Sequence, residues 1–256
     1  MKRDRIFILK FFLLFIIFIP SLVSAKKTIP EEEDSFALNG KGVEAYSSGE
    51  FDKARKNFFE GLKVATLYLD PITSAILVNN IACTDLKETY SPLESEDTIR
   101  SVYSSLITYD QPALAVIALN NLAVLDLRGG RLDSAIEKFK KVEQYQGTHL
   151  NLRGEGIALN NLAICYRKKG QFDKAILSVN KAISIFESEP YENGLANAYY
   201  NKGMIYLDQK NPEIAIGFFT LALKYDKKSG DKFNLDKTRD AINTCKKMMG
   251  GKSLSE

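Results

Sequence analysis

The sequence has 256 residues, of which 45% are hydrophobic and 26% are charged, as in an ordinary folded protein. Its formal net charge of +3 comes from the first 25 residues, because residues 26–256 hold 31 Lys and Arg residues against 31 Asp and Glu residues. Phosphate binding needs an excess of basic residues, so we expect no nucleic-acid partner.

The first 25 residues have the order of a secretory signal. A basic segment, 1–10, precedes the apolar run 11–23, and Val23-Ser24-Ala25 places small residues at a cleavage site. The alternative is an uncleaved membrane anchor, but the apolar run is shorter than the ~20 residues that a spanning helix needs. We therefore expect cleavage after Ala25, export to the periplasm or the medium, and membrane contact only if the signal is not cleaved. The acidic segment 31–34 predicts that residues 26–34 form a disordered, charged leader.

A five-residue motif recurs along the rest of the chain. Leu119–Ala123 and Leu159–Ala163 share the sequence LNNLA, and Val78–Ala82 is closely related. If the last, small residue of each motif is taken as an anchor, successive anchors are 40 or 41 residues apart. The anchors are Gly42, Ala82, Ala123, Ala163 and Gly203.

Each anchor is followed by the same pattern of small and large residues. A glycine comes seven residues later in three repeats, a small residue comes twelve later and an apolar one usually comes sixteen later. This spacing predicts two helices separated by a short turn. Ala163 and Ala175 are expected to be buried where the two helices meet, and Pro71 and Pro112 to stand in first helical turns.

This pattern resembles the tetratricopeptide repeat. Tyr166 and Tyr206 match the first aromatic position of that family, whereas Ala45 and Asp126 depart from it. The resemblance covers residues 35–228 as five repeats, and the 40-residue period is similar to that of kinesin light chains and bacterial peptide-sensing regulators. It implies an all-α fold, a right-handed α-solenoid with a concave groove.

Two parts of the chain depart from the repeat. In the second repeat a loop from Lys87 to Glu96 is expected in place of the short glycine turn. The last segment, 229–256, is expected to be a polar capping helix from Phe233 to Met249 with a frayed tail.

The sequence offers no constellation that predicts catalysis. His149 stands alone, in an expected loop from Gln146 to Arg153, and the three cysteines form no CxxC motif. Cys83, Cys165 and Cys245 are therefore interpreted as small apolar residues. We expect no enzyme activity, no cofactor and no metal.

In the resembling family the concave groove is lined by the first helix of each repeat. Positions six before, one after and four after the anchor give mostly apolar residues there, including Ile117, Val124, Leu127, Ile157, Ile164, Arg167 and Met204. The positions three and two before the anchor give Asn79, Asn80, Asn120, Asn121, Asn160, Asn161, Tyr200 and Asn201. Asparagine is a poor residue inside a helix, so its recurrence needs a reason. The asparagines either bind the backbone of a peptide, as in the resembling families, or join neighbouring helices.

These observations predict an exported adaptor that binds a peptide or a partner protein in its groove. The alternative is a structural subunit of an envelope complex, or a homo-oligomer, whose groove is permanently filled.

Overall fold

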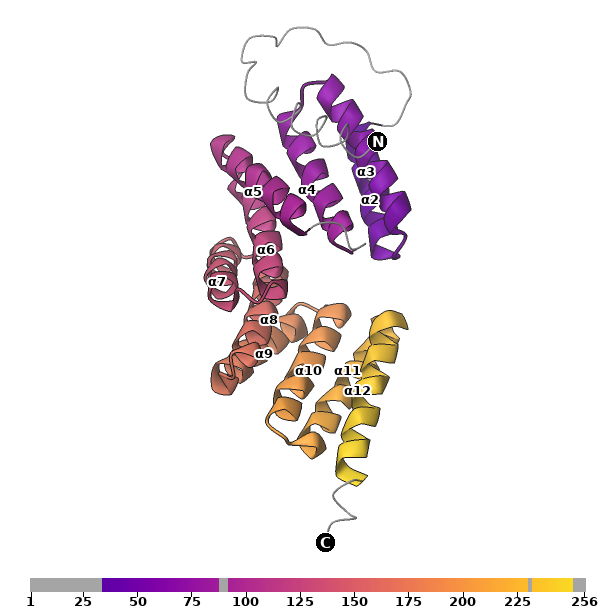
Figure 1. Cartoon of the computed structure of the whole chain (residues 1–256), viewed down its shortest axis with the longest axis vertical. Helices are drawn as coiled ribbons and strands as arrows, with labels where there is room; N and C mark the ends of the chain where they lie inside the picture. The colour runs from indigo at the N-terminus through magenta and orange to yellow at the C-terminus, as the bar shows by residue number, and fades with distance from the viewer. Residues whose placement is uncertain (1–33, 88–91, 230–231, 251–256) are drawn as a thin grey trace. The chain divides into compact units, whose positions relative to one another are not determined.

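The computed structural model describes residues 34–87, 92–229 and 232–250. Within these ranges the regular elements are helices and no strand occurs, which confirms the all-α prediction (Figure 1). The predicted signal peptide and residues 26–33 of the leader lie outside these ranges. The helices are α2 (Ser35–Ser47), α3 (Phe51–Leu67), α4 (Pro71–Lys87), α5 (Pro92–Thr108), α6 (Pro112–Arg128), α7 (Leu132–Thr148), α8 (Leu152–Lys168), α9 (Phe172–Ser188), α10 (Glu192–Asp208), α11 (Pro212–Ser229) and α12 (Lys232–Gly250).

The chain divides into two compact units, residues 1–98 and residues 99–256. In the first unit α2 packs on α3, and α3 packs on α4. In the second unit each helix from α6 to α11 packs on the next one, and α11 packs on α12. This packing of neighbours in chain order is that of an α-solenoid, as the repeat predicted.

The 40-residue period has a simple structural origin. In the repeat that spans α8 and α9, two helices of 17 residues and two turns of three residues fill it completely. The middle residue of most described turns adopts a positive φ, which ends one helix sharply before the next begins. These middle residues are Gly49, Leu69, Asp110, Gly130, Leu150, Gly170 and Lys210.

In the first unit the core lies where the α2–α3 pair meets α4. The anchor Gly42 lies directly against the ring of Phe58, so a Cβ atom at this position would overlap the ring. Phe58 and Leu77 are fully buried, and Ala54 completes the close contact of the two helices. The side chain of Asp34 caps α2 by accepting a hydrogen bond of 2.7 Å from the amide of Ala37.

The second unit has a longer core built in the same way. Ala163 and Ala175 have no exposed surface, which confirms that both lie buried between helices. A Cβ atom on the anchor Gly203 would lie 2.7 Å from the ring of Phe219. The buried rings of Phe139, Phe186 and Phe219 fill the space that these small residues leave.

Two expected loops are shorter than predicted. Helix α4 extends to Lys87 and α5 begins at Pro92, so the predicted loop from Lys87 to Glu96 is wrong. Proline is favoured in a first helical turn, and its φ suits that position. The predicted loop from Gln146 to Arg153 is also wrong, because α7 continues to Thr148 and α8 begins at Leu152.

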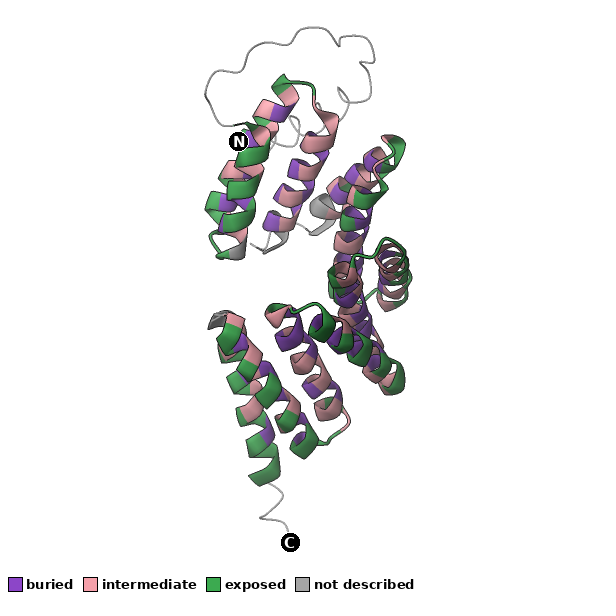
Figure 2. Cartoon of the chain, turned by 180° about the vertical axis from the view of Figure 1, so that it is seen from behind, coloured by how far each residue is buried: buried purple, intermediate pink, exposed green. Residues whose placement is uncertain are grey.

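The last helix, α12, has the polar character expected of a cap. Most of its residues with a described side chain are exposed (Figure 2), and among them Thr238 and Cys245 are buried. Cys245 packs with Ala215 and Phe219 of α11. None of the described helices combines the length and the apolar character that a membrane span requires.

Candidate functional site

The first helices of three successive repeats in the second unit, α6, α8 and α10, present one continuous side of predicted groove residues. We call this side the asparagine face. It consists of Ile117, Asn120, Asn121 and Val124 on α6, Ile157, Asn160, Asn161, Ile164 and Arg167 on α8, and Tyr200, Asn201 and Met204 on α10. Helix α8 contacts both α6 and α10, so these residues form neighbouring rows.

The apolar residues of this face differ in exposure. Ile117 is 50% exposed and Ile157 is 37% exposed, so both present apolar surface to solvent on this face. Val124, Ile164 and Met204 are half-buried. Leu127, which the repeat frame also placed here, is only 9% exposed and belongs to the core.

Asparagines join first helices in both units. In the first unit Asn80 of α4 donates a hydrogen bond of 2.9 Å from Nδ2 to Oδ1 of Asn39 in α2, while Asn79 is buried. In the second unit Asn201 donates a hydrogen bond of 3.0 Å to Oδ1 of Asn160. Part of the asparagine ladder therefore holds neighbouring repeats together.

The pair between α6 and α8 is different. Oδ1 of Asn120 is buried and has no hydrogen-bond partner among the described residues. Asn161 occupies the same repeat position as Asn201, yet within the described ranges its side chain makes no hydrogen bond. A buried acceptor without a donor is unfavourable by about 1–3 kcal/mol. Asn120 and Asn161 are thus an open pair, whereas the equivalent pairs Asn39–Asn80 and Asn160–Asn201 are closed by a hydrogen bond.

An ion pair crosses the C-terminal end of the asparagine face. Arg167 donates a hydrogen bond of 2.6 Å from Nη1 to Oδ2 of Asp208 at the end of α10. Burial raises the pKa of Tyr200, and the positive charge of Arg167 partly offsets that shift. The ring centroids of Tyr200 and Phe219 are 5.3 Å apart. The Nζ atom of Lys237 lies over the ring of Tyr200, 3.9 Å from its centroid.

A pocket of ≈ 540 Å³ lies between α10 and α12. We call it the end pocket. It is lined by Tyr200, Met204 and Leu207 of α10 and by Asp236, Lys237, Asp240, Ala241 and Thr244 of α12. Sequence reasoning placed Tyr200 and Met204 in the groove but did not foresee that the capping helix would enclose them.

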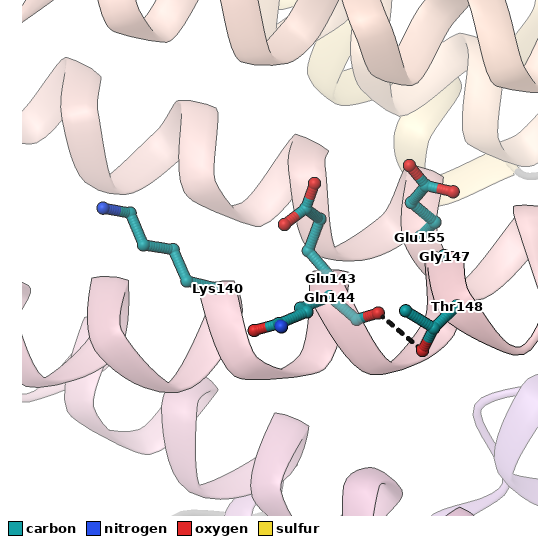
Figure 3. Close-up of a pocket in the computed structure, with 6 residues that line it drawn as sticks. All are labelled: Lys140, Glu143, Gln144, Gly147, Thr148 and Glu155. Atoms are coloured by element: carbon teal, nitrogen blue, oxygen red, sulfur yellow. Dashed lines mark hydrogen bonds between the residues drawn. The ribbon is translucent and has the colours of Figure 1, made fainter.

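A second hollow, of ≈ 510 Å³, lies along α7 and the first turn of α8 (Figure 3). Lys140, Glu143 and Gln144 border it on α7, and Glu155 reaches it from α8. The hydroxyl of Thr148 donates a hydrogen bond of 3.0 Å to the carbonyl oxygen of Gln144 and so closes the helix end. This hollow is open, and apart from Gly147 its lining residues have charged or polar side chains.

His149 and Cys165 are of residue types that often take part in catalysis, but their contacts indicate a structural role. The ring of His149 stacks on Tyr145 at 3.9 Å between centroids, and its Nδ1 atom lies 2.8 Å from the Tyr145 carbonyl oxygen. Burial raises the pKa of Cys165 to about 11, so its thiol stays protonated at neutral pH. No group of three or more His, Cys, Asp and Glu residues in the described part of the chain could hold a metal ion.

Sequence reasoning missed the role of Asp126, which it saw only as a departure from the repeat. The carboxylate is 3% exposed and accepts hydrogen bonds of 2.6 Å from Arg131, Ser134 and Lys138. Burial raises its pKa, but the three donors lower it by more, so the net shift is downward. Asp126 stands near the end of α6, and its donors lie in the next turn and in α7. The buried carboxylate and the two cations therefore join α6 to α7.

The fold and the asparagine face define a helical-repeat protein with 40-residue units. Residues 154–228 match the tetratricopeptide repeat family, which confirms the repeat type predicted from the sequence. No curated protein sequence matches the chain significantly.

Solved structures share the fold at low sequence identity. A Rap protein complexed with competence and sporulation factor has a TM-score of 0.74 and 13% identity, over 89% of this chain and 67% of that one. PlcR of Bacillus thuringiensis, in complex with the peptide PapR7 and DNA, has a TM-score of 0.68 and 13% identity, over 81% and 73%. Kinesin-light-chain-like repeats from Podosopora anserina have a TM-score of 0.56 and 12% identity, over 76% and 95%.

Proposed function

We propose that this chain is a non-enzymatic adaptor whose asparagine face binds an extended peptide or an extended segment of a partner protein. The observation that carries the proposal is the side chain of Asn161, which is half-buried, makes no hydrogen bond within the described ranges and stands on the same helix as the exposed Ile157. A backbone N–H or C=O group of a ligand would pair with that amide, and Ile117 and Ile157 would contact the side chains of the ligand.

Helix spacing suits an extended ligand. Packed helices lie about 8–10 Å apart, and an extended chain advances about 3.3 Å per residue. A peptide that crosses α6, α8 and α10 would therefore meet a new helix about every third residue. An asparagine amide offers both an acceptor and donors, so it can bind the N–H and C=O groups of any peptide. Each such bond contributes about 0.5–1.5 kcal/mol, and micromolar affinity is the expected range.

Proteins of the same fold support this class of function. The Rap structure contains competence and sporulation factor, and the PlcR structure contains the peptide PapR7. The PlcR structure also contains DNA. For the present chain the balanced charge of residues 26–256 still favours a protein or peptide partner over a nucleic acid.

We also propose that the adaptor acts outside the cytoplasm, because residues 1–25 have the order of a cleaved signal. Mass spectrometry of the protein from its native source should find Lys26 as the first residue. An intact Met1 in the membrane fraction would contradict the cleavage.

A displayed library of random peptides tests the binding function. Peptides selected on the immobilised chain would be labelled, and their affinities compared by fluorescence anisotropy for the parent chain, Asn161→Ala and Asn201→Ala. The first variant alters the open pair and should weaken binding about 2- to 10-fold, which corresponds to one hydrogen bond. The second alters the closed pair and should mainly lower the melting temperature.

Two outcomes would contradict the proposal. Selected peptides that bind Asn161→Ala as tightly as the parent chain would remove the asparagine face from the site. A chain that selects no peptide and is a stable oligomer in light scattering would favour the alternative function, a subunit whose groove is filled by a second copy.

A further inference from the structure

We propose that the end pocket binds one large apolar side chain of the partner together with a Lys or Arg side chain next to it. This inference rests on the proposed function, since it assigns a sequence preference to one end of the ligand path. In that function the asparagine face binds the backbone of the peptide, so it gives little preference for the amino-acid sequence of the peptide. The end pocket lies where α10 leaves that face, so it can supply the preference.

The pocket has an apolar floor fixed by the core. Met204 and Leu207 of α10 and Ala241 of α12 are partly buried and pack on the cluster that contains Phe219 and Cys245. The volume of ≈ 540 Å³ lies within the range of about 300–1,000 Å³ that is usual for ligand sites. An apolar side chain that enters would leave water and contact three apolar side chains on a rigid support.

The edge of the pocket on α12 is acidic, although the helix itself is basic. Asp236 and Asp240 are the two acidic residues of α12, and both line the pocket. They stand four residues apart, one helical turn, where like charges destabilise each other. Asp236 forms an exposed ion pair of 3.1 Å with Arg239, while Asp240 has no ion-pair partner among the described residues. A cation brought by the ligand would relieve this repulsion.

The pocket already accommodates one ammonium group. The Nζ atom of Lys237 lies 3.9 Å from the centroid of the Tyr200 ring, so the aromatic wall on that side is occupied by a cation. Of the two lining carboxylates, Asp236 is paired with Arg239, so the carboxylate of Asp240 is the one left for a ligand cation.

The methionines provide a direct reporter. The sequence has four of them, Met1, Met204, Met248 and Met249, and only Met204 lines the pocket. With ¹³C-methyl methionine in the full chain, the Met204 signal is assigned by its loss in Met204→Leu. The probes are three capped dipeptide amides at millimolar concentration: acetyl-Phe-Lys, acetyl-Phe-Glu and acetyl-Gly-Lys.

We expect acetyl-Phe-Lys to shift the Met204 signal in a saturable way while the signals of Met248 and Met249 stay in place. Acetyl-Phe-Glu should bind more weakly than acetyl-Phe-Lys, by about 2- to 5-fold for each carboxylate of the pocket that faces it. This factor corresponds to the free energy of an exposed ion pair. Acetyl-Gly-Lys should give no saturable shift, because it lacks the apolar group. Replacing Asp236 and Asp240 together by Asn should remove the preference for Lys, whereas Asp173→Asn, an exposed acid on α9, should keep it.

A Met204 signal that responds to no probe, or that responds equally to acetyl-Phe-Lys and acetyl-Phe-Glu, would overturn the assignment. These failures are distinguishable from failure of the proposed function. If library-selected peptides bind through Asn161 but leave Met204 unshifted, the adaptor function stands and the end pocket is not part of its site. If neither readout responds, both proposals fail.

Discussion

Asn201 of α10 donates a hydrogen bond of 3.0 Å from Nδ2 to Oδ1 of Asn160 in α8, 41 residues earlier in the chain. Asn80 stands in the same relation to Asn39 in the first unit, with a distance of 2.9 Å. In both pairs the residue two before an anchor donates to the residue three before the preceding anchor. The recurring asparagines therefore have a structural role wherever this bond is closed.

The first prediction separates that structural role from ligand binding. Asn201→Ala should lower the free energy of unfolding by about 0.5–1.5 kcal/mol, because the hydrogen bond to Asn160 is lost. Asn161→Ala changes the same repeat position on α8, where the described structure closes no such bond. It should leave stability within about 0.5 kcal/mol of the parent chain. Chemical denaturation monitored by circular dichroism measures both, and equal losses would show that the two positions do not differ.

The second prediction uses two helical glycines with opposite surroundings. A Cβ atom on Gly203 would lie 2.7 Å from the Phe219 ring, so Gly203→Ala should overpack the α10–α11 contact and lower stability by about 1–2 kcal/mol. Gly217 in α11 is exposed and has nothing within 4 Å of the corresponding position. Gly217→Ala should therefore raise stability by about 0.5–1 kcal/mol through helix propensity alone. Thermal melting of the two variants checks the sign, and stabilisation by both would contradict the repeat frame.

Much of the fold could be predicted because the repeat fixes it locally. Small anchors such as Gly203 and large partners such as Phe219 are separated by a constant number of residues, so helix contacts follow from spacing. Turn positions follow as well, since a middle residue such as Gly170 suits the positive φ that the turn requires. The positions of the asparagine face on the first helices follow from the same spacing, whereas its role in binding stays a prediction.

What could not be predicted depends on contacts between residues that no local pattern links. Whether an asparagine pair forms its hydrogen bond depends on how closely two helices approach, and the two paired residues are 41 positions apart in the sequence. The buried carboxylate of Asp126 is favourable only because Arg131 of the turn and Lys138 of α7 converge on it. The predicted loop from Lys87 to Glu96 was wrong because α5 begins at Pro92, and a proline in a first helical turn starts a helix without any glycine before it.

The third prediction concerns the pH dependence of that cluster. The pKa of Asp126 is lowered in the folded state, since hydrogen bonds from Lys138, Ser134 and Arg131 outweigh the effect of burial. A carboxyl group with a lowered folded pKa stabilises the fold fully above its unfolded pKa of about 4. That contribution is lost as the pH falls from about 4 through the folded pKa. Asp126→Asn should therefore be less stable than the parent chain by about 1–2 kcal/mol at neutral pH.

The difference between the parent chain and Asp126→Asn should shrink as the pH falls below about 4, in denaturation curves measured from pH 7 to pH 2. Asp133→Asn is the matched control. Its carboxylate pairs with Lys169 in the structure but is 88% exposed, so solvent screens the pair. A difference that stays constant with pH would show that the charge of Asp126 does not matter.

The last prediction concerns the turn between α7 and α8. Leu150 is the middle residue of that turn, with a φ of 56° and 82% of its surface exposed. A leucine is unfavourable in the left-handed region because its Cβ atom approaches the next carbonyl oxygen. The exposed side chain gains little from packing that could offset this strain. Leu150→Gly should therefore raise stability by about 0.5–1 kcal/mol, even though glycine makes the unfolded chain more flexible.

The equivalent turn one helix later supplies the reverse substitution. Gly170 has a φ of 70° at the middle of the turn between α8 and α9, and no atom lies within 4 Å of an added Cβ. Gly170→Leu should lower stability by about 1 kcal/mol through backbone strain, because no steric overlap contributes. Opposite shifts of the melting temperature for the two variants would show that backbone conformation alone controls these turns. A destabilised Leu150→Gly chain would show that the strain at Leu150 is smaller than the flexibility that glycine adds to the unfolded chain.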